Sequence, residues 1–379
     1  MLRAILASLR SPWLFHRVGA AILFFFAAAA SFNGFQDISG FANDAEAYPP
    51  YGVSFIGAIT STAQKPFVFR RMLPDIANWT TAITPRPLQD RLHNWFYPSV
   101  GPDLHSKILS FGRSDAAQSR TWFFPYLVLY ICQFLSTLLA VIAMHLLCRA
   151  MGLQPAVTLF APVIVILIVP YIFSAYYDCT ELALFFLAAW LALRFRWWWL
   201  LPIAALGAWN KESFLFFIPT LYPFLRMRAS RKTSLAAVVV LCALCGLIYL
   251  HALSLFAHNA NTGAWLQWKT HFSDLLNSHA QLFVNDEVYG IRILRVSTLA
   301  PTLLLIWALA RAWKHLSVAV RRHTFIAAAI NFPLYLLFGN GGEYRNLSML
   351  SIFFLLAVAW NLEDGLKHME CAQPVSGKV

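Results

Sequence analysis

The sequence predicts an all-α membrane protein that crosses the bilayer many times, and three observations support this fold class. The 379 residues are 59% hydrophobic and only 12% charged, whereas soluble domains carry about a quarter charged residues. Apolar runs of near-spanning length recur along the chain. Basic residues gather between these runs, as they do in loops on the cytoplasmic side. We therefore expect one integral membrane domain over residues 1–379.

About ten apolar segments are expected to cross the membrane as helices. Several are shorter than the ~20 residues of a full crossing, so these are expected to be extended at their ends, tilted or partly re-entrant. The first resembles a signal peptide, but its basic flank is long and we expect a retained anchor. The segments are 17–35, 122–147, 157–175, 180–194, 197–210, 213–225, 234–256, 297–312, 324–338 and 347–362.

The short connections 226–232 and 311–323 set the expected orientation. Both are rich in Lys and Arg, which the positive-inside rule assigns to the cytoplasm. Of 17 acidic residues, only Glu363, Asp364 and Glu370 would share that side. We expect cytoplasmic N- and C-termini in the inner (plasma) membrane and an active periplasmic face. Because the basic residues flank spans, the net charge of +12 predicts no nucleic-acid partner.

Residues 36–121 form the long first periplasmic loop in this arrangement. Three acids, Asp37, Asp44 and Glu46, follow the first span closely. A carboxylate there can act as a general base or as a ligand for a divalent cation.

The same loop also carries basic and aromatic stretches. The run 65-KPFVFRRMLPDIANW-79 contains Arg70 and Arg71, and 89–111 mixes aromatic with charged residues. This composition is typical of helices that lie in the membrane interface. The alternative is a solvated loop without a site.

Two further polar stretches border the expected spans on the periplasmic side. In 176-YYDCTEL-182, Asp178 and Glu181 either stabilise a helix N-terminus or serve function. The stretch 207-GAWNKESFLFF-217 places ionisable residues beside spans. Ionisable residues at such positions usually face a bundle interior or a water-filled cavity and are functional. The alternative there is an ion pair that only fixes packing. The candidate residues of this second stretch are Asn210, Lys211 and Glu212.

The stretch 338-FGNGGEYRNLSML-350 places Glu343 and Arg345 before the last span. Arginine presents a planar fork of donors that suits phosphate, although an ordinary turn with a snorkelling arginine is equally consistent. A single pocket would unite all these stretches, with carboxylates for catalysis and cations for an anionic headgroup. The chain has no Walker loop, HExxH or GxSxG motif, which disfavours nucleotide-dependent and zinc-hydrolase mechanisms.

This order of parts resembles the GT-C superfamily of membrane glycosyltransferases, in particular small bacterial members. The stretches 66-PFVFRRMLP-74, 210-NKES-213 and 343-EYRN-346 are also similar to elements of such proteins. The resemblance implies transfer of a sugar from a polyprenyl-phosphate donor to a glycan or lipid-linked acceptor on the outer face of the membrane. The partners would be that donor, that acceptor and membrane lipid.

The resemblance also implies residue roles. A first-loop acid acts as general base, which assigns the role to Asp44 first and then to Asp37 or Glu46. It implies no certain cofactor; a divalent cation, Mg²⁺ or Mn²⁺, aids this base in some members. Lys211 and Arg345 would stabilise the departing phosphate. The binding set expected beside the acids is Arg70, Arg71, Asp178, Glu181, Asn210, Lys211, Glu212, Glu343 and Arg345.

Three other functions fit the sequence. A polysaccharide polymerase or ligase of the lipid-linked glycan pathway would depend on arginines more than on acids. A secondary transporter or flippase would usually show internal repeats and charges near mid-span, and the two halves show no convincing repeat. A non-catalytic assembly subunit would need none of the candidate residues.

Overall fold

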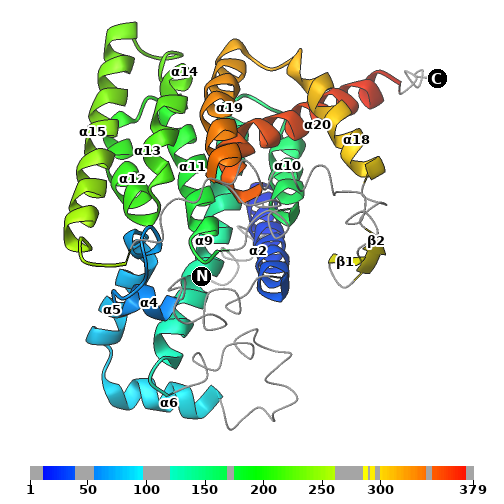
Figure 1. Ribbon diagram of the computed structural model, residues 1–379. Coiled ribbons are helices and arrows are strands. Elements are labelled where there is room, and N and C mark those ends of the chain that lie inside the picture. Colours follow the sequence, from blue (N-terminus) through cyan, green and yellow to red (C-terminus); the bar gives the residue numbers. More distant parts are fainter. Residues whose placement is uncertain are drawn as a thin grey trace, which may run out of the picture.

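The computed structural model describes residues 12–38, 55–96, 120–168, 175–260, 285–288, 291–294, 299–338 and 344–372. Almost all of them are helical (Figure 1). The elements are α2 (Pro12–Ile38), α4 (Phe55–Ile59), η1 (Phe67–Phe69), α5 (Met72–Ile83), α6 (Arg86–Phe96), α9 (Phe123–Ala150), α10 (Pro155–Ile168), α11 (Asp178–Leu193), α12 (Trp197–Asn210), α13 (Ser213–Phe217), η4 (Ile218–Leu221), α14 (Tyr222–Leu225), α15 (Arg231–Leu255), β1 (Asn285–Val288), β2 (Ile291–Leu294), α18 (Leu299–Trp313), α19 (Val318–Phe338), η6 (Tyr344–Leu350) and α20 (Ser351–Ala372).

Every one of the predicted apolar segments overlaps helical structure in the described part of the chain. Within the described residues, four helical stretches are long and apolar enough to cross a membrane, and two shorter ones are apolar: Val18–Gln36, Phe123–Ala150, Arg231–Leu255 and Arg345–Met369, with Pro155–Ile168 and Ser213–Leu225. The predicted helical class is thus confirmed, and these helices are compatible with a membrane protein.

One departure from the all-α prediction is the strand pair β1–β2. The strands are antiparallel, with Asn285 opposite Leu294 and Val288 opposite Ile291. Residues 291–294 read Ile-Arg-Ile-Leu, in which β-branched side chains alternate with another type and favour a strand. The prediction treated this stretch only as a connection between spans.

Helix α11 is the centre of the bundle. It contacts α9, α12, α14 and α20, and nearly all of its side chains are buried, from Asp178 to Leu193. A helix that is apolar all round is buried either among other elements or in a membrane, and α11 is buried among other helices. The two acids in its first turn are therefore carried into the interior along with the apolar residues.

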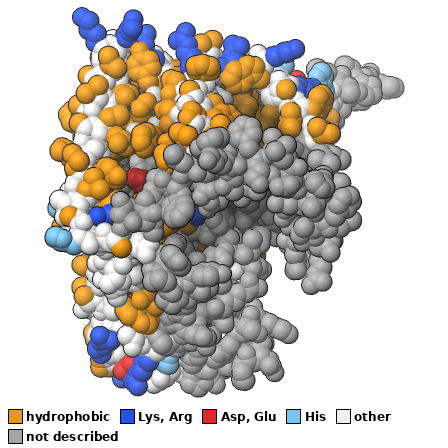
Figure 2. Space-filling model, in the orientation of Figure 1, with side chains coloured by type: hydrophobic (Ala, Val, Ile, Leu, Met, Phe, Trp, Pro, Cys, Tyr) orange, Lys and Arg blue, Asp and Glu red, His pale blue; other side chains and the backbone are white. Residues whose placement is uncertain are grey.

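The outer helices present apolar side chains to their surroundings. Leu235, Val239 and Leu250 on α15 and Leu135 on α9 are exposed. Figure 2 shows hydrophobic side chains covering the upper part of the face that it draws. Lys and Arg side chains line the rim at one end (Figure 2). That end carries the connections α14–α15 and α18–α19 (Figure 1), whose sequences are the basic ones singled out above.

The described part of the first loop lies at the other end of the helices (Figure 1). The prediction of helices within this loop is confirmed by α4, α5 and α6. Leu73 and Ala77 of α5 belong to a buried cluster with Leu129 of α9. The Lys65 Nζ atom donates to the carbonyl of Ala257, just after α15, at 2.7 Å. The loop is thus attached to both α9 and α15.

A close contact fixes the turn between α12 and α13. Gly207 lies on α12, and a Cβ atom added there would lie 2.4 Å from the ring of Phe214 on α13. Helix α12 ends at Asn210, and Lys211 has an extended backbone (φ −161°, ψ 136°). The missing side chain at Gly207 lets Phe214 pack back against α12, so the chain can turn at Lys211 and continue as α13.

We predict that Gly207→Ala lowers the thermal unfolding temperature of the purified protein. The new methyl group overlaps a buried ring, and overpacking typically costs about 1–3 kcal/mol. Gly246→Ala on α15 is the matched control, because nothing lies within 4 Å of its added Cβ and alanine favours a helix. Equal unfolding temperatures for the two variants would contradict the contact.

Candidate functional site

The candidate site begins where the first loop meets the end of α12 (Figure 1). Arg70, directly after η1, holds the carboxylate of Glu212 with two nitrogens: Nη2 donates to Oε1 at 2.7 Å and Nε to Oε2 at 3.2 Å. This is the bidentate geometry that arginine forms best. Arg70 also donates to the hydroxyl of Tyr177 and lies over its ring at 4.3 Å from the centroid. One guanidinium therefore joins three segments.

A second, deeper ion pair follows directly in the chain. The Lys211 Nζ atom donates to Glu181 Oε2 at 2.7 Å and lies 3.4 Å from Asp178 Oδ1. Ser213 donates its hydroxyl to the other oxygen of Glu181, and the backbone N–H of Ala175 donates to Asp178 Oδ2 at 3.0 Å. Both acids stand in the first turn of α11, where the helix dipole also favours negative charge.

Arg345 brings the far end of the chain to the same acids. Its Nη1 atom lies 3.7 Å from Asp178 Oδ2. Asp178 therefore stands between Lys211 and Arg345, with one oxygen toward each. The side chain of Asp178 is fully buried, while that of Arg345 is 16% exposed.

Arg71 makes a separate link to the first-loop helix α5. It pairs with Asp75 and donates to the carbonyl of Ala58. The indole N–H of Trp209, on α12, donates to the other oxygen of Asp75 at 2.9 Å, and the backbone N–H of Arg71 donates to the carbonyl of Trp209 at 3.0 Å. The loop and α12 are thus joined through both backbone and side chains.

The charges of this network are balanced among the described residues. Four cations meet four carboxylates: Arg70, Arg71, Lys211 and Arg345 with Asp75, Asp178, Glu181 and Glu212. Removing ions from water costs several kcal/mol each, and the cost is offset only where partners and hydrogen bonds are well placed. The cations expected to bind an anionic headgroup already have protein partners, so a first role of the network is to hold these segments together.

In the Arg70–Glu212 pair, Glu212 is the more exposed residue, with 25% of its side chain exposed. Burial alone would lower the pKa of Arg70, but the Glu212 carboxylate raises it above its ordinary value. Burial alone would raise the pKa of Glu212, but Arg70 holds it below its ordinary value. Both groups are consequently charged at neutral pH.

Within the part of the chain that the structure describes, one buried polar atom at the site lacks a partner. Asn210 is 1% exposed, and its amide nitrogen donates to the carbonyl of Tyr177 at 3.1 Å. Among the described residues, the Oδ1 atom of Asn210 finds no hydrogen-bond donor. A buried acceptor without a donor costs about 1–3 kcal/mol, so this oxygen is a natural point of contact for a bound hydroxyl or water.

Aromatic rings close the apolar side of the site. Phe185 lies one helical turn beyond Glu181 on α11 and stacks on Phe217 at 4.0 Å between ring centroids. Phe214 lies 5.5 Å from both. All three are fully buried or nearly so. The side chains of Lys211 and Glu181 are themselves only 7% and 1% exposed, so their attraction is little screened by water.

The structure brings seven of the predicted binding residues together in this network: Arg70, Asp178, Glu181, Asn210, Lys211, Glu212 and Arg345. Arg71 lies beside them in its own pair. Asp44, Glu46 and Glu343 lie outside the described residues, and only the backbone of Asp37 is described, at the end of α2.

Four residues of the network were missed by the sequence analysis: Tyr177, Asp75, Trp209 and Ser213. All lie in or beside the polar stretches quoted there, and Tyr177 directly precedes Asp178. A tyrosine next to a buried acid was the available signal, but nothing in the sequence linked it to Arg70.

Among the described residues, no group of three or more His, Cys, Asp or Glu side chains is arranged to hold a metal ion. Asp178 and Glu181 accept hydrogen bonds from Lys211, Ser213 and the backbone, which a cation would have to displace. These two acids therefore do not fit a divalent cation.

The chain was compared with protein-family models, curated proteins and solved structures. None of the three comparisons finds a match.

We predict that Lys211→Met strongly destabilises the protein. It leaves Asp178 and Glu181 buried without their cation, and loss of one partner from a buried pair typically costs about 3–5 kcal/mol. Lys367→Met is the matched control, because Lys367 is 56% exposed in its pair with Glu363 and such pairs contribute about 0–1 kcal/mol. The measurement is the free energy of unfolding of each variant and of the wild type in detergent. A loss for Lys211→Met no larger than for the control would show that the buried pair is not formed.

The Arg70–Glu212 pair predicts a specific pH dependence. The folded-state pKa of Glu212 lies below its ordinary value of 4.5, so its stabilisation is complete above that value and is lost as pH falls through the folded-state pKa. The wild type is expected to exceed Glu212→Gln in stability at neutral pH, and the two are expected to converge in acid.

Thermal unfolding across this pH range is the measurement. Asp90→Asn is the control, because Asp90 pairs with Arg120 at an exposed position and should behave like the wild type. A difference between wild type and Glu212→Gln that stays constant with pH would contradict the ion pair.

Proposed function

We propose that the protein transfers a sugar from a polyprenyl-phosphate donor to a glycan or lipid-linked acceptor at the outer face of a bacterial inner membrane. The observation that carries the proposal is the meeting of Lys211 and Arg345, residues from distant parts of the chain, at one buried acid, Asp178. The family resemblance described above supplies the reaction type, and the geometry supplies a site.

We place about ten crossings in the membrane, with the basic end in the cytoplasm. The rim of Lys and Arg side chains in Figure 2 supports this orientation through the positive-inside rule. The candidate site would then face the periplasm together with α5 and α6. Short helices such as α10 would cross only in part, since 14 residues are fewer than a full crossing needs.

Arg345 is the residue we assign to the donor phosphate. Its side chain is more exposed than that of Lys211, and its contact with Asp178 is longer than the Lys211–Glu181 contact. Lys211 would act as a positioning residue, holding Asp178 so that the guanidinium of Arg345 points in a fixed direction. A preorganised donor of this kind typically contributes about 2.7–4 kcal/mol to a transition state.

The reaction would be an inverting displacement. The oxygen of an acceptor hydroxyl attacks the anomeric carbon while the bond from that carbon to the phosphate oxygen breaks. The carboxylate of Asp44 takes the hydroxyl proton, with Asp37 or Glu46 as the alternative base. Polyprenyl phosphate leaves with the bonding electrons, and Arg345 neutralises its charge. The orphan oxygen of Asn210 would accept a hydrogen bond from a sugar hydroxyl.

The direct test is turnover of radiolabelled polyprenyl-phosphate sugars by the purified protein in lipid nanodiscs. Asp44→Asn is expected to lower the rate about 10²–10⁴-fold, and Arg345→Ala about 10²–10³-fold. Asp90→Asn is the matched control, since it removes an exposed carboxylate from the same loop and should leave the rate unchanged. Donor turnover that survives in Asp44→Asn would refute this base.

Three outcomes would move the protein to another class. Loss of activity with Arg70, Arg71 or Arg345, while all three first-loop acids are dispensable, would favour a polymerase or ligase. Transport of a lipid-linked glycan by proteoliposomes without any sugar transfer would favour a flippase. Stable, folded variants of Arg345 with an unchanged cellular phenotype would favour an assembly subunit.

A further inference from the structure

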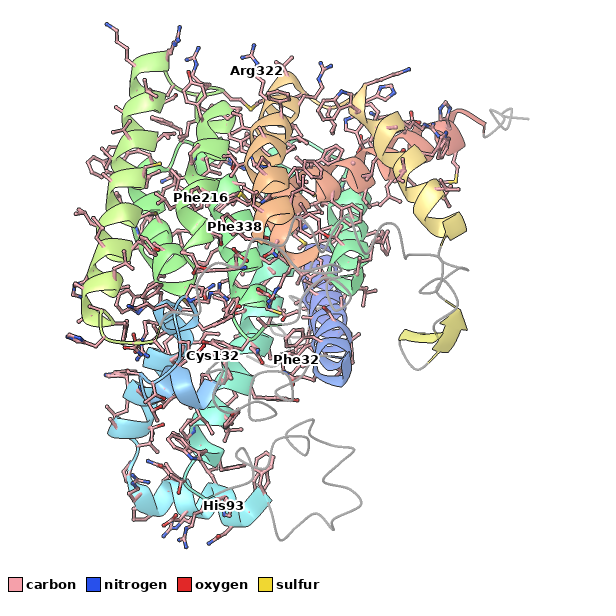
Figure 3. All side chains as sticks on the ribbon, viewed as in Figure 1. Phe32, His93, Cys132, Phe216, Arg322 and Phe338 are labelled. Atoms are coloured by element: carbon pink, nitrogen blue, oxygen red, sulfur yellow. The ribbon has the colours of Figure 1, made fainter. Side chains whose placement is uncertain are left out.

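A groove of about 780 Å³ lies at the basic end of the molecule, away from the candidate site. It is formed by α14, α19 and the connection that precedes each of α15 and α19. Arg322, at the outward end of α19, marks its position in Figure 3. The network described above uses none of the residues that line it.

The polar lining of this groove is cationic. Arg226, Arg321 and Arg322 line it, and none of the described residues that line it is acidic. Within the described residues, no acidic side chain pairs with these three arginines; Arg226 donates to the carbonyl of Ala229 at 2.6 Å. Two acidic residues of α20, Glu363 and Asp364, pair with Lys367 and Arg311 respectively.

The N-terminus of α19 opens into the same groove. Ser317 and Val318, at the start of this 21-residue helix, belong to its lining. The first N–H groups of a helix lack helical acceptors, and the helix dipole favours an anion there. In α19 one of these groups, the N–H of Val320, donates to Ser317 Oγ at 3.3 Å. Two independent features of the groove, its arginines and this helix end, therefore favour the same kind of ligand.

Several of the residues that line the groove are apolar and exposed. Phe325 is 72% exposed and Trp313 37% exposed, and Val318 and Met227 are also exposed lining residues. Rings and aliphatic side chains beside cations match a molecule with a charged head and apolar tails. Basic pockets between helices at the cytoplasmic membrane surface bind anionic lipid headgroups in this manner.

We propose that this groove binds the headgroup of one anionic phospholipid from the leaflet at the basic end of the protein. The phosphate lies between Arg226, Arg321 and Arg322 at the start of α19, and the acyl chains run past Phe325. The proposal requires that the helices span a membrane but does not depend on the sugar-transfer reaction.

The test counts lipids retained by the purified full chain in native mass spectrometry. We expect one phosphatidylglycerol to be retained in preference to phosphatidylcholine with the same acyl chains. Replacing Arg226, Arg321 and Arg322 together by Gln is expected to weaken retention by about tenfold or more. The matched control removes three exposed charges from the same end outside the groove: Arg228→Gln, Arg231→Gln and Lys232→Gln.

A second variant, Arg321→Lys with Arg322→Lys, keeps the charge and is expected to retain the preference even if the triple Gln variant does not fold. Equal loss in the triple variant and its control would overturn the proposal, because attraction would then be unspecific. Equal retention of phosphatidylcholine would overturn it as well. Glycerol 3-phosphate binding as tightly as the lipid would assign the groove to a soluble phosphate instead.

Discussion

The attraction of Lys211 for Asp178 and Glu181 is the interaction on which the rest of the structure depends. Helix α11 is buried on all sides, so its first-turn acids have no water to stabilise their charge. The helix dipole contributes about 1 kcal/mol at most in ordinary settings, far less than desolvation costs. Cations from other segments must therefore reach these acids, and the fold is arranged so that they do.

This requirement explains several local features together. The chain leaves the helical conformation at Lys211 because the ammonium group must turn toward α11, and the close approach of Phe214 to Gly207 makes that turn compact. Arg70 then holds Glu212, the next residue in the turn. Ion pairs join the first loop, α11, the α12–α13 turn and Arg345 of η6, which suits a site whose donors must keep their direction.

The sequence was sufficient for the helices but not for the network. Long apolar runs have few alternatives to helix formation, so all ten predicted segments overlap helices. The basic connections between spans led to the prediction that the polar stretches lie on the same side of the membrane. Which charges pair was not predictable, since Arg70 and Glu212 are 142 positions apart and periodicity carries no information on such contacts. Tyr177 and Asp75 were overlooked for the same reason.

The most direct measurement of the network is a double-mutant cycle between Arg70 and Glu212. The free energies of unfolding of Arg70→Met, Glu212→Gln and the double variant are compared with that of the wild type. A buried bidentate pair predicts a coupling energy of about 1–3 kcal/mol, with the double variant less damaged than the two single losses imply. Additive losses, within about 0.3–0.5 kcal/mol, would show that the two side chains do not meet and would contradict the account.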